Sequence, residues 1–340
     1  MTQKTIYLHI GRHKTGTSSI QHFVNGCPEM LADLNLYYPQ VGKSTIAHHD
    51  LAGLLAIQSN KTAEAQQQTL QSPDLAALLE EINNQPCNVL LSSESFQNSH
   101  PTVIQQAFAN YDLRVLVYIR NQIDYLASSY AQRVWATPYC ESMEHYYDNV
   151  FSVDYFGFLN RWQDACSGKI TVRKFERQSL SENDIVVDFF EKMLNISDNS
   201  VKQQIINREL EDANPSLTSD LLAYKLRYNE SAPDCSEAQQ RIVRQALAQL
   251  SLKKESPPVR VTSELKDRCV QSSTPINEKV SKHYFDSEEL FSLDRPTGNP
   301  SVLSRENFID ISEKLIALDS RISSQILEFT EATYPTRKVS

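Results

Sequence analysis

The sequence predicts an α/β protein: a central parallel sheet flanked by helices, with a mostly helical C-terminal half. In the first part of the chain, segments rich in β-branched and aliphatic residues alternate with helix-like stretches, the order that builds a parallel sheet. Beyond residue 195 the strand-like segments cease. The 340 residues also exceed the roughly 250–300 at which a single core stops growing. We therefore expect an α/β core over residues 1–195 and a helical extension over residues 196–340 that packs on it.

Four segments have the composition of strands: residues 5–10, 88–92, 113–119 and 170–175. Each is followed by a stretch with helical spacing. The third segment, LRVLVYI, is almost continuously apolar, which is typical of a strand buried on both faces of a sheet. Residues 36–38 predict a further, short edge strand.

The C-terminal half has four helix-like segments: residues 217–228, 237–250, 263–270 and 305–329. Apolar residues recur at a spacing of three or four in the last segment, at Phe308, Ile311, Leu315, Leu318, Ile322 and Phe329. Such a stripe forms either a dimer seam or the face of a helix that packs on its own core. We prefer the second interpretation, because it is the commoner arrangement.

Composition excludes several classes of protein. The net charge of −9, without any basic run, argues against a nucleic-acid partner held by phosphate contacts. The chain has no apolar run of about 18 residues and no signal-peptide profile, so we expect a cytoplasmic protein without a membrane span. The six cysteines are scattered and no zinc-ligand spacing occurs, which predicts reduced thiols and no metal site.

The segment IGRHKTGTSSI stands out because it contains two of only eight glycines, Gly11 and Gly16. It lies between the first predicted strand and a helix, where a loop presents backbone N–H groups to an anion. Lys14 adds a positive charge to this loop. Hydroxyl donors follow at Thr15, Thr17, Ser18 and Ser19. The segment therefore predicts a phosphate or sulfate site, although it matches neither the Walker A nor the GxGxxG pattern. The alternative is an ordinary strand–turn–helix with a Ser/Thr N-cap.

GRHKTGTSS resembles the GxxKTGT[ST] loop that binds the 5′-phosphosulfate of 3′-phosphoadenosine-5′-phosphosulfate (PAPS) in sulfotransferases. VYIRNQIDYLASSYAQ resembles a second segment of that family, in which the residues matching Arg120 and Ser128 hold the 3′-phosphate. Gln122 replaces the proline that the family usually has there. The resemblance implies a bacterial-type sulfotransferase with the P-loop NTPase-like sulfotransferase fold. It also implies a set of PAPS-binding residues: Arg12, His13, Lys14, Thr15, Gly16, Thr17, Ser18, Arg120 and Ser128.

Periodicity is consistent with the second motif. A helix that begins near Gln122 places one apolar set, Ile123, Leu126, Tyr130 and Val134, on one face. Ser128 then falls on the opposite face, and Arg120 ends an apolar strand at the edge where ligands bind in α/β sheets. The alternative is an ion-pair role for Arg120 and a solvated position for Ser128.

The expected reaction is transfer of a sulfuryl group from PAPS to a hydroxyl of a carbohydrate or another polar acceptor, with 3′,5′-ADP (PAP) as product. Lys14 is the candidate for stabilising the leaving oxygen. Glu94 is the first candidate for the general base, because it follows a strand where carbohydrate-type relatives carry a catalytic glutamate. His48 and His49 compete with it, since histidine has a suitable pKa. A non-catalytic nucleotide-binding scaffold and, less well supported, a nucleotide kinase are the alternatives.

Overall fold

The computed structural model describes residues 3–56, 63–208, 217–231, 236–253, 256–286, 289–299 and 302–334. The chain divides into two compact units. The first unit comprises Met1–Asn121, Asp154–Glu211 and Ile276–Leu290, and the second comprises Gln122–Val153, Asp212–Pro275 and Phe291–Ser340. The units therefore alternate along the sequence, and the division predicted after residue 195 stays a prediction. Each unit is described by itself below.

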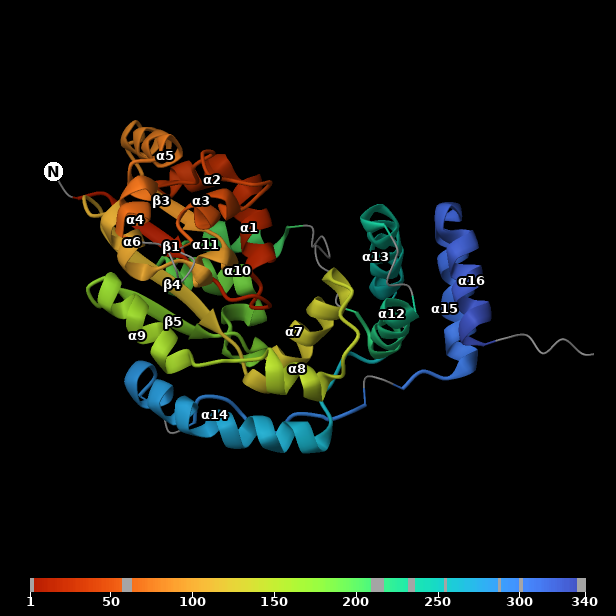
Figure 1. Ribbon diagram of the computed structural model, residues 1–340. Helices are drawn as coiled ribbons and strands as arrows, with labels where there is room; N and C mark the ends of the chain where they lie inside the picture. Colours follow the sequence, from red (N-terminus) through yellow and green to blue (C-terminus); the bar gives the residue numbers. More distant parts are fainter. Residues whose placement is uncertain are drawn as a thin grey trace, which may run out of the picture. The chain divides into compact units, whose positions relative to one another are not determined.

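The first unit is built on one five-stranded sheet, in the order β2-β3-β1-β4-β5 (Figure 1). The strands are β1 Thr5–His9, β2 Leu36–Tyr37, β3 Asn88–Ser92, β4 Asp112–Ile119 and β5 Ile170–Lys174. All four neighbouring pairs are parallel. The predicted α/β class with a central parallel sheet is confirmed, and so are all five predicted strands to within one residue at either end. Because β1 lies between β3 and β4, the loops that follow these three strands meet at one edge.

Helices flank the sheet. One face carries the side chains of Leu90, Leu116 and Tyr118, which pack in a core cluster with residues of α1, α2, α10 and α11. The alternate side chains of the strands point to the other face, where α9 contacts β4 and α6 contacts α9. The helices of this unit are α1 Thr17–Gly26, α2 Pro28–Asp33, α3 His49–Leu54, α4 Ala63–Leu70, α5 Pro73–Asn83, α6 Pro101–Ala107, α9 Tyr155–Ala165, α10 Ile185–Asp188 and α11 Asn199–Ile206. Short 3₁₀ segments occupy Glu94–Asn98, Arg177–Ser179 and Ser181–Asn183, and a π-helical turn occupies Phe189–Met193.

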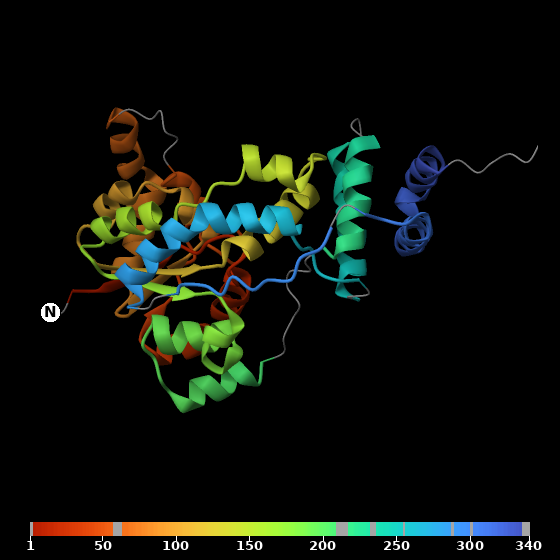
Figure 2. The same ribbon diagram turned by 90° about the horizontal axis from the view of Figure 1, so that it is seen from below.

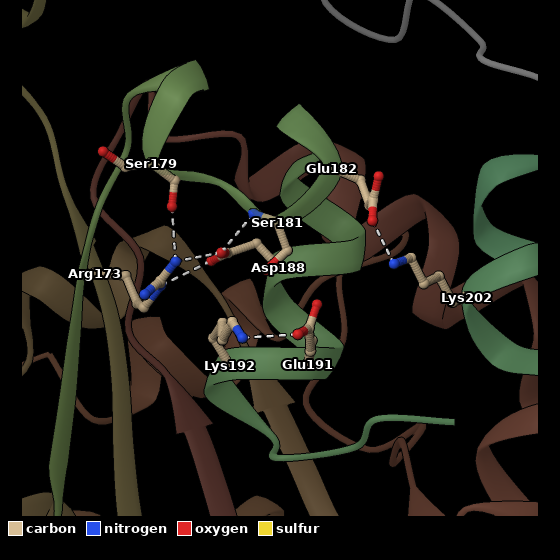
Figure 3. Close-up of polar contacts among 8 residues, drawn as sticks. All are labelled: Arg173, Ser179, Ser181, Glu182, Asp188, Glu191, Lys192 and Lys202. Atoms are coloured by element: carbon tan, nitrogen blue, oxygen red, sulfur yellow. Dashed lines mark hydrogen bonds and ion pairs between the residues drawn. The ribbon is translucent and has the colours of Figure 1, made fainter. Parts of the chain in front are cut away.

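A buried carboxylate ties the last strand to α10 (Figure 3). Asp188 has no exposed surface, and it accepts hydrogen bonds from Arg173 Nε at 3.0 Å and from the backbone N–H of Ser181 at 3.0 Å. On the strand side, the Tyr118 hydroxyl donates to the same carboxylate at 2.7 Å. Arg173 also donates to the backbone carbonyl of Ser179 at 2.8 Å. The charge of Asp188 is thus fully paired, as a buried carboxylate requires.

The described elements of the second unit are helices, apart from one isolated β-bridge between Thr218 and Pro258. Its helices are α7 Gln122–Ala136, α8 Met143–Asn149, α12 Ser219–Ser231, α13 Glu237–Leu252, α15 Arg305–Leu318 and α16 Ser323–Thr333, with a 3₁₀ turn at Ser320–Ile322. The long helix α14, Ser263–Tyr284, begins in this unit and ends in the first. Both views show α15 and α16 side by side (Figures 1 and 2), and their apolar faces share one core cluster with α12 and α13.

Two helix predictions for this half of the chain are wrong. The single helix expected over residues 305–329 is broken at Asp319, whose extended backbone and side chain cap the 3₁₀ turn that follows. Five residues of the predicted stripe are buried in the core of their own unit, and only Leu318, at 40%, is exposed. The stripe therefore packs on the core of its own unit, which is the interpretation preferred from the sequence. The helix expected over residues 263–270 instead continues through Pro275.

Among the residues described, no helix has the length and the apolar composition that a membrane crossing requires. The five cysteines in this part of the chain, Cys27, Cys87, Cys140, Cys166 and Cys269, are free thiols. Cys235 lies outside the described residues.

Candidate active site

The loop after β1 is shaped by its two glycines. Both have positive φ, 37° at Gly11 and 76° at Gly16, as does Lys14 between them at 66°. A Cβ on Gly11 would lie 2.6 Å from Thr17 Cγ2, and one on Gly16 would lie 2.9 Å from Phe175 Cε2. Glycine is favoured at both positions, because a Cβ would clash there and because the backbone angles strain other residues. Gly16 also caps α1 without a side-chain acceptor, so the N-terminal end of α1 is of the kind that an anion can cap.

Arg120 fastens this loop to the end of β4. Its Nη1 donates to the backbone carbonyl of Lys14 at 2.8 Å, and its guanidinium lies 5.6 Å from the ring centre of Phe175. Tyr155, the first residue of α9, holds the backbone of Arg120. The Tyr155 hydroxyl donates to the Arg120 carbonyl at 2.6 Å and accepts from its N–H at 3.3 Å. The arginine predicted to bind phosphate is thus placed at the loop predicted to bind the phosphosulfate.

The same tyrosine supports the second arginine of the site. The Arg12 guanidinium lies 5.1 Å from the ring centre of Tyr155 and 4.9 Å from that of Phe158. The Thr15 hydroxyl donates to the backbone carbonyl of Arg12 at 2.6 Å, which closes the turn of the loop. Two guanidinium groups and the Lys14 ammonium therefore belong to one short stretch of the carboxyl edge, a charge arrangement suited to an anion.

Lys14 lies half-buried at the centre of these charges. Burial and the neighbouring Arg120 guanidinium lower the pKa of Lys14 from its usual 10.5, while Glu94 acts in the opposite direction. The sequence predicted Lys14 as the group that stabilises a leaving oxygen, and the structure places it beside both a cation and a carboxylate. Burial strengthens such interactions, because less water screens them.

Glu94 begins the 3₁₀ turn that follows β3, and its backbone lies against Gly11. Burial alone would raise the pKa of Glu94, but the hydrogen bond from Gln21, the backbone N–H of Glu94 and the charges of His49 and His13 lower it below its usual 4.5. Gln21 Nε2 donates to Glu94 Oε2 at 3.1 Å. Glu94 is therefore a carboxylate at neutral pH, next to two histidines and Lys14, and can accept a proton.

The two adjacent histidines differ in their surroundings. His49 is half-buried, with its Nδ1 2.8 Å from the Ser93 hydroxyl and 3.5 Å from that of Ser95. His48 has no exposed surface. Its Nδ1 accepts the backbone N–H of Ser92 at 3.2 Å, and its Nε2 lies 3.1 Å from the carbonyl of Pro39.

Burial lowers the pKa of His48 to about 4. Because backbone groups occupy both of its ring nitrogens, this geometry favours a structural role for His48. His49, next to Glu94, remains a candidate for the substrate site.

Ser128, the second predicted ligand of the 3′-phosphate, lies on α7 in the second unit. Its hydroxyl donates to the carbonyl of Tyr125 at 3.1 Å, and its side chain is half-buried. The apolar face predicted for this helix is confirmed, since Ile123, Leu126, Tyr130 and Val134 are all buried. The prediction that Ser128 binds the nucleotide stays a prediction.

Sequence reasoning missed two residues of this site. Gln21 lies on the buried face of α1, where its only sequence signal is a polar residue among the apolar positions Ile20, Phe23 and Val24. Tyr155 was indistinguishable from the other aromatic residues of its region. Their contacts join segments that are 73 and 35 residues apart, so no local pattern could report them.

In the described parts of the chain, no cluster of three or more His, Cys, Asp or Glu side chains could hold a metal ion. No family model and no curated protein matches the sequence. Among solved structures, the chain is similar to a sulfotransferase from Alicyclobacillus acidocaldarius over 83% of this chain and 96% of that one. The two share 13% identity and superpose with a TM-score of 0.42, so this similarity carries no information about the reaction.

Proposed function

We propose that the protein is a PAPS-dependent sulfotransferase acting on a hydroxyl of a carbohydrate or another polar acceptor. One observation carries the proposal: the loop at Gly11–Gly16, the Arg120 guanidinium and the Glu94 carboxylate come together at the carboxyl edge of a parallel sheet. The close fit of Gly11 and Gly16 and the cationic donor set suit a phosphosulfate. The motifs GRHKTGTSS and VYIRN support the same donor.

PAPS supplies a sulfuryl group on a phosphate leaving group, which an acceptor oxygen displaces in line. In the proposed mechanism Lys14 stabilises the negative charge that develops on the bridging oxygen. Glu94 accepts the proton of the acceptor hydroxyl, so that the new O–S bond forms as the old one breaks. Arg12 and Arg120 bind the nucleotide phosphates. His49 is the second candidate for the base, and Ser93 fixes its ring orientation.

The donor site is tested by a thermal-shift titration with PAP, beside ATP with and without magnesium. At a hundredfold excess over Kd, a ligand of the native state adds about 2.7 kcal/mol of stability. We expect PAP to raise Tm in the wild type and in Arg114→Ala, a control on the same strand whose side chain is exposed. Arg120→Ala removes the shift. No shift with PAP, or one only with ATP and magnesium, contradicts the proposal.

Catalysis is tested with labelled PAPS and a panel of monosaccharide, phenol and alcohol acceptors. Removal of one preorganised donor costs about 2.7–4 kcal/mol in the barrier, so Lys14→Ala lowers kcat by roughly 10²–10³. Loss of the general base lowers it by about 10²–10⁴. Glu94→Gln and His49→Gln are compared at saturating PAPS to identify the general base. The base is the residue whose substitution removes turnover while PAP still binds.

A nucleotide-binding scaffold is the second candidate, because the loop and the arginines alone suffice for binding. The carboxylate of Glu94 favours the enzyme, since a scaffold has no use for an ionised base beside two histidines. If the protein binds PAP but transfers the sulfuryl group of PAPS neither to an acceptor nor to water, the scaffold is favoured.

A further inference from the structure

Behind the proposed base, a chain of buried polar groups runs from α1 to the centre of the sheet. Gln21 is 3% exposed, and its Nε2 lies 3.1 Å from Glu94 Oε2 and 3.4 Å from Ser92 Oγ. Ser92 is fully buried, and its hydroxyl lies 2.9 Å from Nδ1 of His9, the last residue of β1. The chain thus links groups from α1, from β1 and from the end of β3.

This arrangement fixes the orientation of the Gln21 amide. Both of its neighbours offer oxygen atoms, and a carboxylate can only accept hydrogen bonds at neutral pH. The amide therefore presents its nitrogen, with one N–H for each oxygen. Burial lowers the pKa of His9 to about 4, so its ring is neutral at pH 7 and adds no positive charge near the Glu94 carboxylate.

We propose that Gln21 is a positioning residue for Glu94, holding the carboxylate ionised and aimed at the acceptor oxygen. The inference rests on the proposed function for its catalytic meaning. Gln21 lies on the same helix whose first turn follows the Lys14 loop, seven residues after Lys14. One helix, α1, therefore positions both the loop that holds Lys14, near the leaving group, and the Gln21 amide that bonds to the proposed base Glu94. An apolar side chain would pack equally well at this buried position. A buried amide is stable only where it has hydrogen-bond partners, and the Glu94 carboxylate is such a partner.

Two substitutions separate the interaction from simple packing. Gln21→Leu removes both hydrogen bonds at similar volume, and Gln21→Glu places a second carboxylate against the first. Each favours the protonated form of Glu94. We expect the pKa of Glu94 to rise by about one unit in Gln21→Leu, as one hydrogen bond to the charged form is lost, and by more in Gln21→Glu. His22→Leu, at an exposed position of the same helix, is the matched control.

The pKa is measured directly by ¹³C NMR on protein labelled at the glutamate carboxyl carbon, with the Glu94 signal assigned from Glu94→Gln. The acid limb of kcat/KM for sulfuryl transfer from PAPS, to an acceptor or to water, should move to higher pH by the same amount. The affinity for PAP should stay within twofold of wild type in every variant. Melting temperatures confirm that each variant folds.

The outcomes distinguish this proposal from the function on which it rests. An unchanged Glu94 titration in both Gln21 variants overturns the proposal, whatever the activity. A shifted titration with an unmoved acid limb overturns the positioning role in catalysis. If the wild type fails to bind PAP, the proposed function fails, and the NMR titration still decides whether Gln21 controls the carboxylate.

Discussion

Tyr155→Phe isolates the hydroxyl that holds Arg120. The phenylalanine keeps the ring beneath the Arg12 guanidinium, and the change removes the hydrogen bonds of 2.6 and 3.3 Å to the Arg120 backbone. A net hydrogen bond is worth about 0.5–1.5 kcal/mol, and a buried acceptor that loses its donor costs about 1–3 kcal/mol. Because Tyr155 is fully buried, we expect a loss of about 1–3 kcal/mol in the free energy of unfolding.

Urea denaturation followed by circular dichroism measures that loss. Tyr111→Phe is the control, because its hydroxyl bonds to Asn83 at an exposed position, where water can replace the partner. A PAP titration on both variants gives the functional part. We expect Tyr155→Phe to weaken PAP by up to roughly tenfold, the equivalent of 1.4 kcal/mol. Unchanged stability together with unchanged PAP affinity would refute the reasoning that Tyr155 places Arg120.

Three further predictions concern stability. Asp188→Ala leaves the charge of Arg173 without its carboxylate and should cost near the lower end of about 3–5 kcal/mol, since 27% of the Arg173 side chain is exposed; urea unfolding checks it. Gly16→Ala should lower stability by about 1–3 kcal/mol and weaken PAP, whereas Gly53→Ala, in α3 with open space around it, should not destabilise; an equal effect of both would contradict the steric argument. The pKa of His48 falls from 6.5 unfolded to about 4 folded, so the unfolded chain binds more protons in that window. The stability that depends on His48 should be complete above pH 6.5 and fall by roughly 3 kcal/mol toward pH 4, and the profile of His48→Gln should be flatter by that amount.

The sheet was predictable from sequence because each strand is a local apolar run bounded by polar residues. Parallel order followed from the alternation with helices. The loop was predictable for a similar reason: two glycines within six residues of a glycine-poor chain indicate a backbone that comes close to a neighbouring group or ligand. These signals are local in the sequence, and the structure agrees with them.

The features that could not be predicted from the sequence depend on contacts between distant segments or on helix capping. The break at Asp319 comes from a single residue with an extended backbone. The apolar spacing continues across this residue, so periodicity alone predicts one unbroken helix. Helix α14 continues through Pro275, although proline usually ends a helix. Adjacent histidines at positions 48 and 49 look equivalent in the sequence, yet only the fold buries one against Pro39 and leaves the other beside Ser93.

The alternation of the two units along the chain has a consequence for biosynthesis. The first unit includes residues 276–290, where the Tyr284 hydroxyl donates to Asn160 at 3.0 Å and the Lys174 ammonium lies 5.7 Å from the ring centre of Phe285. The ribosome makes the whole sheet long before this segment emerges. Until then, the surface of α9 that it covers stays exposed to chaperones and to other nascent chains. A fragment that stops at residue 195 or at Pro275 would keep that surface uncovered, so refolding and expression experiments should use the full chain.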